Sequence, residues 1–146
     1  MDRNGTRLNL WRDCFVVGFA SIQMNARSVK NLQGLHADLV RVIYRANELA
    51  PDSFIVTEGL RSVSRQAELF AKRATRTMKS RHLTGHAVDL MALVNGEGRW
   101  DWPLYSELAK TVKEAAKIEG VPITWGGDWT SFRDGPHFEL PHNKYP

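Results

Sequence analysis

The order in which helical and strand-like apolar patterns alternate is the feature that most narrows the fold of this chain. Apolar residues recur at helical spacing in residues 35–50 and 103–120, which predicts two amphipathic helices. A third helix is expected after Ser62 or Ser64, ending near residue 74. Short strand-like runs occupy residues 54–57, 87–93, 121–125 and 137–140. Because no regular βαβ rhythm appears, we expect an α+β domain with a small, mostly antiparallel sheet flanked by helices.

Length and cysteine usage indicate one domain with an ordinary apolar core. The chain has 146 residues, of which 42% are hydrophobic and 25% are charged. A chain of this length buries enough surface to fold without disulfide bonds. Cys14 is the only cysteine, which excludes an internal disulfide and a cysteine-based zinc cluster.

The longest apolar run, residues 14–22, follows several arginines and superficially resembles the start of a secretory signal. Asp13 lies directly against the run, and no convincing small-residue cleavage site follows it, so we do not expect a signal peptide. The run is also much shorter than the roughly 20 residues that a membrane span needs. We therefore expect an arm or a strand packed on the domain, and no stable membrane insertion.

The charge balance favours an anionic partner without identifying it. Twenty Lys and Arg residues against 16 Asp and Glu residues give a formal net charge of +4. Nucleic acid, acidic lipid and bacterial wall polymer would all suit such a surface. The sequence has no recognisable reading helix or aromatic platform for nucleic acid, so nucleic acid is not an expected partner. The basic segment at residues 75–81 is typical of a solvated surface loop.

Residues 80–89 (SRHLTGHAVD) bring two imidazoles and a carboxylate to a loop that leads into an apolar strand. Burying Asp89 between apolar neighbours is costly unless the carboxylate is paired or binds a cation. His82 and His86 have the spacing of helical zinc ligands, but the residues between them are poor helix formers and include no Glu. We therefore pair His82 with Asp89 and expect His86 to pack in the loop or behind the ligands.

A second cluster comprises residues 125–129 (WGGDW) and 134–140 (DGPHFEL), where Asp134 precedes His137 across a Gly-Pro turn. The two clusters can converge on one metal ion. Three His and Asp ligands with a fourth position for water are typical of catalytic zinc, which is suited to amide hydrolysis. Trp125 and Trp129 either fill the core or line a cleft. No phosphate-binding glycine motif or EF-hand loop occurs.

Taken together, three motifs make the chain resemble the zinc peptidases that cleave peptidoglycan. They are S-x-H-x-x-G-x-A-x-D at residues 80–89, W-G-G-D-W at residues 125–129 and D-x-P-H-F at residues 134–138. The most similar are the phage L-alanyl-D-glutamate endopeptidases, alongside the D-alanyl-D-alanine carboxypeptidases and dipeptidases of the same Hedgehog-like fold. The resemblance spans residues 28–140. Such relatives begin near residue 24, so residues 1–23 look like an N-terminal extension and residues 24–146 like the zinc peptidase domain, with Met24 a candidate start.

The resemblance implies a role for six residues. His82, Asp89 and His137 would bind Zn²⁺, Asp134 would act as general base, Arg61 would lie beside the scissile carbonyl or a substrate carboxylate, and Ser80 would line the substrate cleft. The alternative for Asp134 is a turn carboxylate, and for Arg61 a surface ion pair. Basic residues around the cleft would attract an anionic wall polymer: Lys72, Arg73, Arg76, Lys79 and Arg81.

The implied activity is hydrolysis of peptidoglycan stem peptides at the L-Ala-D-Glu bond by a monomeric phage-type lysin. The chain would be synthesised in the host cytoplasm and act on the cell wall. Asp134, where many relatives carry Glu, favours the endopeptidase branch. The alternatives are a D-alanyl-D-alanine carboxypeptidase or dipeptidase of the same fold and a non-catalytic, zinc-containing wall-binding module.

Overall fold

The computed structural model describes residues 23–146, so the apolar run at residues 14–22 and nearly all of the expected N-terminal extension lie outside the described residues. In chain order the elements are α2 (Ala26–Asn31), α3 (Ala37–Leu49), β1 (Phe54–Glu58), α4 (Val63–Ala71), the 3-10 turn η1 (Arg81–Thr84), β2 (Ala87–Val94), β3 (Glu97–Arg99), α5 (Trp102–Glu119), β4 (Thr124–Trp125), the 3-10 turn η2 (Gly126–Asp128) and β5 (His137–Glu139).

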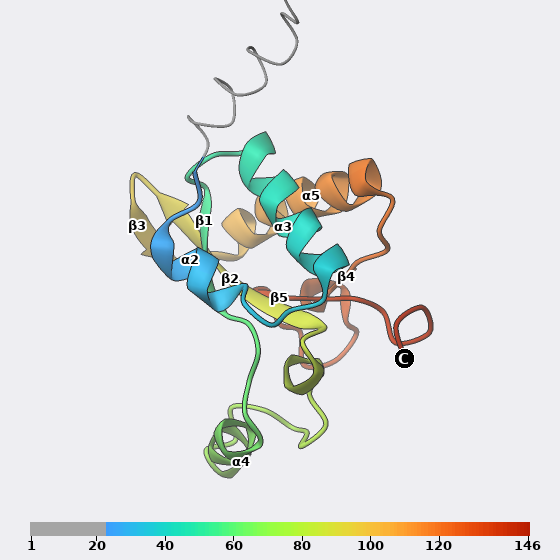
Figure 1. Ribbon diagram of the computed structural model, residues 1–146. Coiled ribbons are helices and arrows are strands. Elements are labelled where there is room, and N and C mark those ends of the chain that lie inside the picture. Colours follow the sequence, from blue (N-terminus) through green and yellow to red (C-terminus); the bar gives the residue numbers. More distant parts are fainter. Residues whose placement is uncertain (1–22) are drawn as a thin grey trace, which may run out of the picture.

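The three predicted helices are present. α3 and α5 pack against each other through the apolar faces that predicted them (Figure 1). The N-cap of α4 is Ser62, whose hydroxyl accepts a hydrogen bond from the backbone N–H of Arg65, and the helix ends at Ala71, somewhat earlier than expected. α2 was not predicted, because its six residues carry no apolar stripe.

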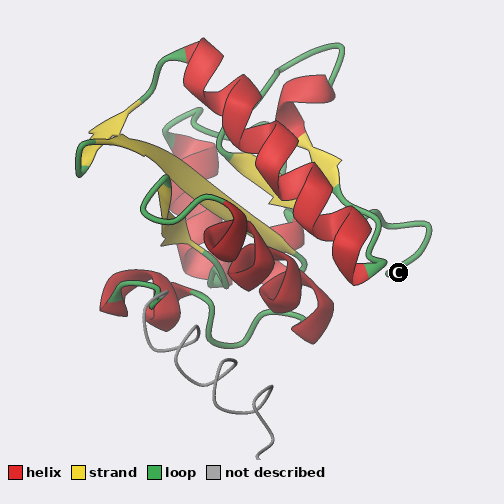
Figure 2. Cartoon of the chain, turned by 90° about the horizontal axis from the view of Figure 1, so that it is seen from above, coloured by secondary structure: helices red, strands yellow, loops and turns green. Residues whose placement is uncertain are grey.

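The strands form one antiparallel sheet in the order β1-β2-β5-β4, with β3 paired to β2, which confirms the α+β expectation (Figure 2). The structure adds a short strand, β3, that the sequence analysis did not predict, and β3 forms a hairpin with β2. Asn95 and Gly96 both have positive φ, 52° and 80°, as a tight hairpin turn requires. The last predicted strand before η2 is shorter than expected and contains only Thr124–Trp125.

The two faces of this sheet differ sharply in the residues they carry. Side chains alternate along a strand, so Val88, Leu90 and Phe138 enter the apolar core that α3 and α5 complete. Asp89, between Val88 and Leu90, and His137, next to Phe138, point to the opposite face. The alternation therefore places the chemistry-bearing residues on the face of the sheet away from the core.

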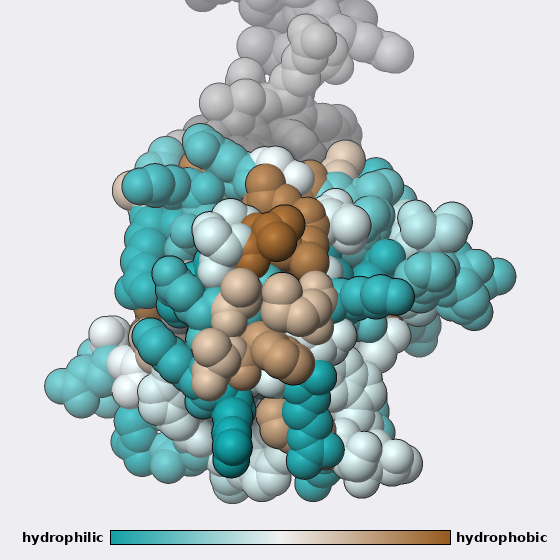
Figure 3. Space-filling model, turned by 90° about the horizontal axis from the view of Figure 1, so that it is seen from below, coloured by the Kyte–Doolittle hydropathy of each residue, from teal (hydrophilic) through white to brown (hydrophobic). Residues whose placement is uncertain are grey.

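α4 lies apart from α3 and α5, at the lower end of the molecule in Figure 1. Figure 3 views the molecule from below and shows apolar side chains gathered in the middle of that face, bordered by hydrophilic ones. Exposed apolar side chains in or beside α4 are Leu60, Val63 and Phe70.

Among the described residues, no helix combines the length and apolar character that a membrane crossing requires.

Candidate metal centre and cleft

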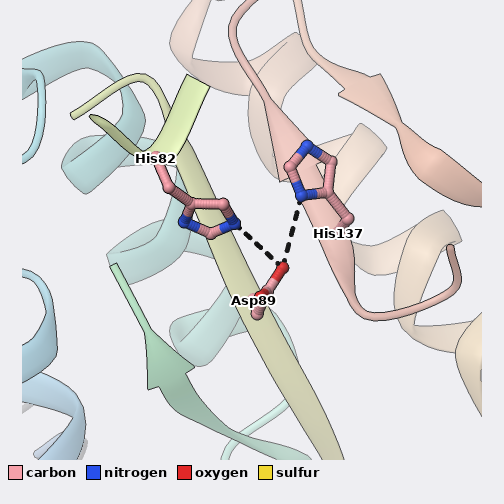
Figure 4. Close-up of side chains that lie close together, drawn as sticks. All are labelled: His82, Asp89 and His137. Atoms are coloured by element: carbon pink, nitrogen blue, oxygen red, sulfur yellow. Dashed lines mark hydrogen bonds and ion pairs between the residues drawn. The ribbon is translucent and has the colours of Figure 1, made fainter. Parts of the chain in front are cut away.

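Three of the predicted site residues meet at one point. The pairing of β2 with β5 places Asp89 directly opposite His137, and η1 brings His82 to the same place. Asp89 Oδ1 lies 3.2 Å from His82 Nε2 and 3.3 Å from His137 Nδ1 (Figure 4). One potential ligand atom from each residue lies within 4.8 Å of the other two. These side chains therefore form a compact donor set of two nitrogens and one oxygen.

The outer nitrogen of each imidazole has its own hydrogen-bond acceptor. His82 Nδ1 lies 2.8 Å from the carbonyl oxygen of Gly59, and His137 Nε2 lies 2.7 Å from Glu139 Oε2. A carbonyl or carboxylate oxygen can only accept, so each of these nitrogens carries the hydrogen. When each ring is neutral, its inner nitrogen, which faces Asp89, therefore carries the lone pair. This arrangement is the usual one for metal-binding histidines.

Two lone pairs and a carboxylate that face one another need a positive charge between them, either a proton or a metal ion. Burial alone would raise the pKa of Asp89, but hydrogen bonds from His137 and His82 hold that pKa well below its usual range. Burial alone would lower the pKa of His137, but the hydrogen bonds to Asp89 and Glu139 raise it to about 9. The group therefore attracts a cation strongly, and its residues fit a divalent metal ion.

The local sequence explains how His82 is positioned. Ser80 is the N-cap of η1, because its hydroxyl accepts a hydrogen bond from the backbone N–H of His82. Gly85 ends the turn with a φ of 75°, a conformation that glycine adopts without strain. Gly59, which accepts the His82 hydrogen bond, lies so close to the backbone of Asn31 that a Cβ would collide with it.

A β-bulge near the end of β1 supplies a residue that the sequence analysis missed. Between Val56 and Glu58 the register with β2 shifts, so that Glu58 is paired with Asp89. Without the shift, alternation would place Glu58 on the core face with Val56. Its carboxylate binds Arg61 in a bidentate pair, with distances of 2.8 Å to Nε and 2.7 Å to Nη2.

Arg61 is largely occupied by its neighbours. Besides the pair with Glu58, its Nη1 donates to Gln66 Oε1 at 2.8 Å, and its Nη2 lies 3.6 Å from Asp89 Oδ2. The side chain is only 7% exposed. The structure thus places Arg61 against the candidate metal ligands, with most of its N–H donors already used.

Asp134 lines the same cleft as the three converging residues. Its backbone N–H donates to the carbonyl of Gly126, and a Cβ at Gly126 would collide with the Asp134 backbone. Its carboxylate makes no hydrogen bond to the described residues. Burial, followed by the negative charge of Asp89, raises the pKa of Asp134. A partly buried, unpaired carboxyl in a cleft can accept and return a proton.

The cleft has a volume of about 430 Å³ and contains Ser80 among its lining residues. Of the two tryptophans, Trp125 is buried in the core, whereas Trp129 lines the cleft and lies 5.2 Å from His137, measured between ring centroids. Of the predicted basic residues, Arg76, Lys79 and Arg81 line the cleft. His86 packs against His36, the N-cap of α3, and belongs neither to the donor set nor to the residues that line the cleft.

Three supporting residues were not predicted: Glu58, Gln66 and Glu139. The sequence contains a signal for one of them, because Glu139 follows His137 by two positions in a strand and must share its face. Glu58 depends on the bulge, and Gln66 depends on how α4 packs beside Arg61. Neither of these two has a local signal.

The chain is similar to several known proteins. A family model described as phage L-alanyl-D-glutamate peptidase matches residues 20–141. The L-alanyl-D-glutamate peptidase of Escherichia phage T5 is 30% identical over 129 residues, which cover 86% of this chain and 93% of that protein. The Serratia marcescens L-Ala D-Glu endopeptidase ChiX has a TM-score of 0.80 and 45% identity, covering 88% of this chain and 96% of that one. The D,D-dipeptidase VanXYg shares the fold, with a TM-score of 0.52 and 21% identity over 76% of this chain and 53% of that one.

Proposed function

The chain belongs to the phage L-alanyl-D-glutamate peptidase family, and on this basis we propose that it is a zinc endopeptidase that hydrolyses the L-Ala-D-Glu bond of peptidoglycan stem peptides. The observation that carries the proposal is the convergence of His82, Asp89 and His137 in one cleft beside the unpaired carboxyl of Asp134. Two imidazoles and a carboxylate suit zinc, which is held in many hydrolases by three such ligands with a position open to water.

Each residue has a distinct part in the proposed reaction. When bound by His82, Asp89 and His137, zinc would supply a Lewis acid that makes water more acidic and polarises a carbonyl. Asp134 accepts the proton of the attacking water and then delivers it to the leaving amine. The raised pKa of Asp134 brings it closer to the value that a proton shuttle needs near neutral pH.

Arg61 and Ser80 support this chemistry in the proposal. Arg61 Nη2 lies 3.6 Å from Asp89 Oδ2, so its positive charge stands beside the metal-binding group and favours negative charge that develops on a carbonyl in the cleft. Ser80 already accepts a hydrogen bond from His82, so its own O–H can be donated to a bound peptide. We infer that the chain acts as a monomer on peptidoglycan, whose anionic character suits the cleft-lining cations.

The test is digestion of purified sacculi with the full chain, followed by mass spectrometry of the fragments. We expect peptides that begin with a free D-glutamyl amine, while L-Ala stays on muramic acid. A chelator should abolish their release and added Zn²⁺ should restore it. Release of free D-Ala instead would identify a D,D-carboxypeptidase, and binding to sacculi without any cleavage would identify a wall-binding module.

The variant that tests the general base is Asp134→Asn, which we expect to lower kcat about 10²–10⁴-fold while zinc stays bound. Asp128→Asn is the matched control. Asp128 belongs to the same part of the chain, but its carboxylate is exposed and pairs with Lys113 outside the cleft. Unchanged turnover in Asp134→Asn would refute the assignment of the base.

A further inference from the structure

The cations that line the cleft differ in how far their neighbours occupy them. Arg61 is bound by Glu58 and Gln66, and Arg81 donates to the carbonyl oxygens of Leu140 and Tyr145. Two further cations line the same cleft, Arg76 and Lys79. Neither makes an ion pair with any residue in the described part of the chain. These two side chains are therefore the ones available to an anionic group in the cleft.

Of these two, Arg76 is held in place by an aromatic ring. Its Cζ lies 4.3 Å from the centroid of the Phe132 ring, which belongs to the loop between η2 and β5. Stacking on a ring face leaves the N–H groups at the edge of the guanidinium free to donate. Phe132 is 45% exposed and has a φ of 49°, an uncommon conformation for a bulky residue. Such strain is often found where a loop presents a side chain to a ligand.

The backbone next to Arg76 is also tied to the candidate metal centre. Gln66 is fully buried and accepts a hydrogen bond from Arg61 through Oε1. Its Nε2 donates to the carbonyl oxygen of Thr77 at 2.6 Å, one residue after Arg76. These two hydrogen bonds, from Arg61 to Gln66 and from Gln66 to Thr77, therefore fix the position of the Arg76 backbone relative to Asp89. Lys79 lacks the aromatic contact.

A substrate with an L-Ala-D-Glu bond carries an anionic group close to the bond that is cut. A glutamyl residue has two carboxyl groups, and a peptide that continues through one of them leaves the other free. The alanine on the other side of the scissile bond supplies no such group. A guanidinium fork matches a carboxylate in shape and charge.

We propose that Arg76, held by Phe132, binds the free carboxylate of the glutamyl residue on the leaving side of the scissile bond. This subsite rests on the proposed endopeptidase function. It explains how the cleft distinguishes an acidic leaving group even though Arg61 is occupied by Glu58. Arg76 is a binding residue here, so its loss affects substrate choice and leaves the metal centre intact.

The test compares two synthetic stem peptides that differ in one group. The carboxylate peptide has the free carboxylate on its D-glutamyl residue, and the carboxamide peptide has a carboxamide in that place. We expect the unmodified chain to hydrolyse the carboxylate peptide with a kcat/KM at least about tenfold higher, as one charge-assisted hydrogen bond allows. In Arg76→Gln this ratio should fall to about one. Lys79→Gln is the matched control and should keep the ratio.

Phe132→Ala provides a second variant, and it should lower the ratio by freeing the Arg76 side chain, whereas Phe132→Tyr should preserve it. An unchanged ratio in Arg76→Gln, or an equal fall in Lys79→Gln, would overturn the subsite and leave the endopeptidase function standing. If the unmodified chain cleaves neither peptide at the L-Ala-D-Glu bond, both the proposed function and the subsite are refuted. Equal zinc content in all variants excludes damage to the metal centre as the cause.

Discussion

The two faces of the sheet carry neighbouring residues with opposite tasks. Phe138 is fully buried in the core beneath α3 and α5, whereas His137 and Glu139, on either side of it, point toward the cleft. On β2, Val88 and Leu90 are buried in the same core, and Asp89 between them joins the metal-binding group. Adjacent residues of the same two strands therefore serve different purposes: one stabilises the core and the next lines the cleft.

The cleft face can hold a costly cluster of charged and polar groups because burial of apolar side chains on the other face supplies the free energy of folding. Buried apolar side chains contribute about 1.5–3 kcal/mol each. The cluster of imidazoles and carboxylates, by contrast, is held by register and hydrogen bonds. Substitutions on the two faces should therefore separate metal binding from stability.

The largest expected effect on the cleft face is that of Asp89→Asn. Loss of the carboxylate removes one ligand and the negative charge between two imidazoles, so we expect zinc binding and hydrolysis to be lost while the fold is retained. Zinc content after gel filtration and the circular dichroism spectrum measure both. Met91→Ala, on the same face and strand but outside the cleft-lining residues, is the control and should keep its zinc. A zinc-replete Asp89→Asn protein would contradict the assignment.

The corresponding change on the core face is Phe138→Ala. Emptying this fully buried position should lower the free energy of unfolding by about 3–5 kcal/mol. Thermal unfolding should show a fall in Tm of roughly 10–15 °C for a chain of this size. Below its transition, the variant should still bind one zinc ion per chain. Loss of zinc from the folded variant would show that the two faces are not separable.

A smaller effect is expected for Glu139→Gln. Its carboxylate accepts from His137 Nε2 at 2.7 Å, so the change weakens the orientation of one ligand without removing it. We expect the Kd for zinc to rise about 10–100-fold, and the Tm of the metal-free protein to stay nearly constant. Glu97→Gln, on the exposed strand β3, is the control and should leave the Kd unchanged.

The smallest expected effect is the change in zinc affinity for each unit of pH. The pKa of His137 is raised to about 9, so below that pH the metal-free site holds a proton that zinc must displace. The apparent affinity should therefore rise about tenfold for each pH unit up to about pH 9 and then level off. Competition with a chromophoric chelator between pH 6 and pH 8 measures the slope. In Glu139→Gln the pKa of His137 falls, so the slope should flatten at a lower pH.

Much of the fold and the centre of the site could be predicted because their signals are local. The helical stripes of α3 and α5 and the alternation in β2 are patterns over a few residues. The motif around Asp89 predicted its grouping with His82 and His137, which the structure brings together. The hairpin strand β3 was missed even though Asn95-Gly96 is a recognised hairpin signal.

The supporting residues could not be predicted in the same way. Glu58 faces the cleft because of a bulge, and the local sequence does not mark that bulge. Gln66 reaches both Arg61 and Thr77 because α4 is placed beside the loop that follows it. Arg76 meets Phe132 because two loops far apart in the sequence close over one cleft.

The amino-acid sequence carries the signals for the three longer helices, for most of the strands and for the residues that share a strand face, since these depend on the periodicity of neighbouring side chains. Contacts between distant segments set the register that places Asp89 opposite His137, the bulge that turns Glu58 toward the cleft and the partners that occupy Arg61. The two kinds of information act over different distances along the chain. Periodicity acts over a few residues, whereas register, hydrogen-bond partners and burial depend on how segments distant in the chain pack together.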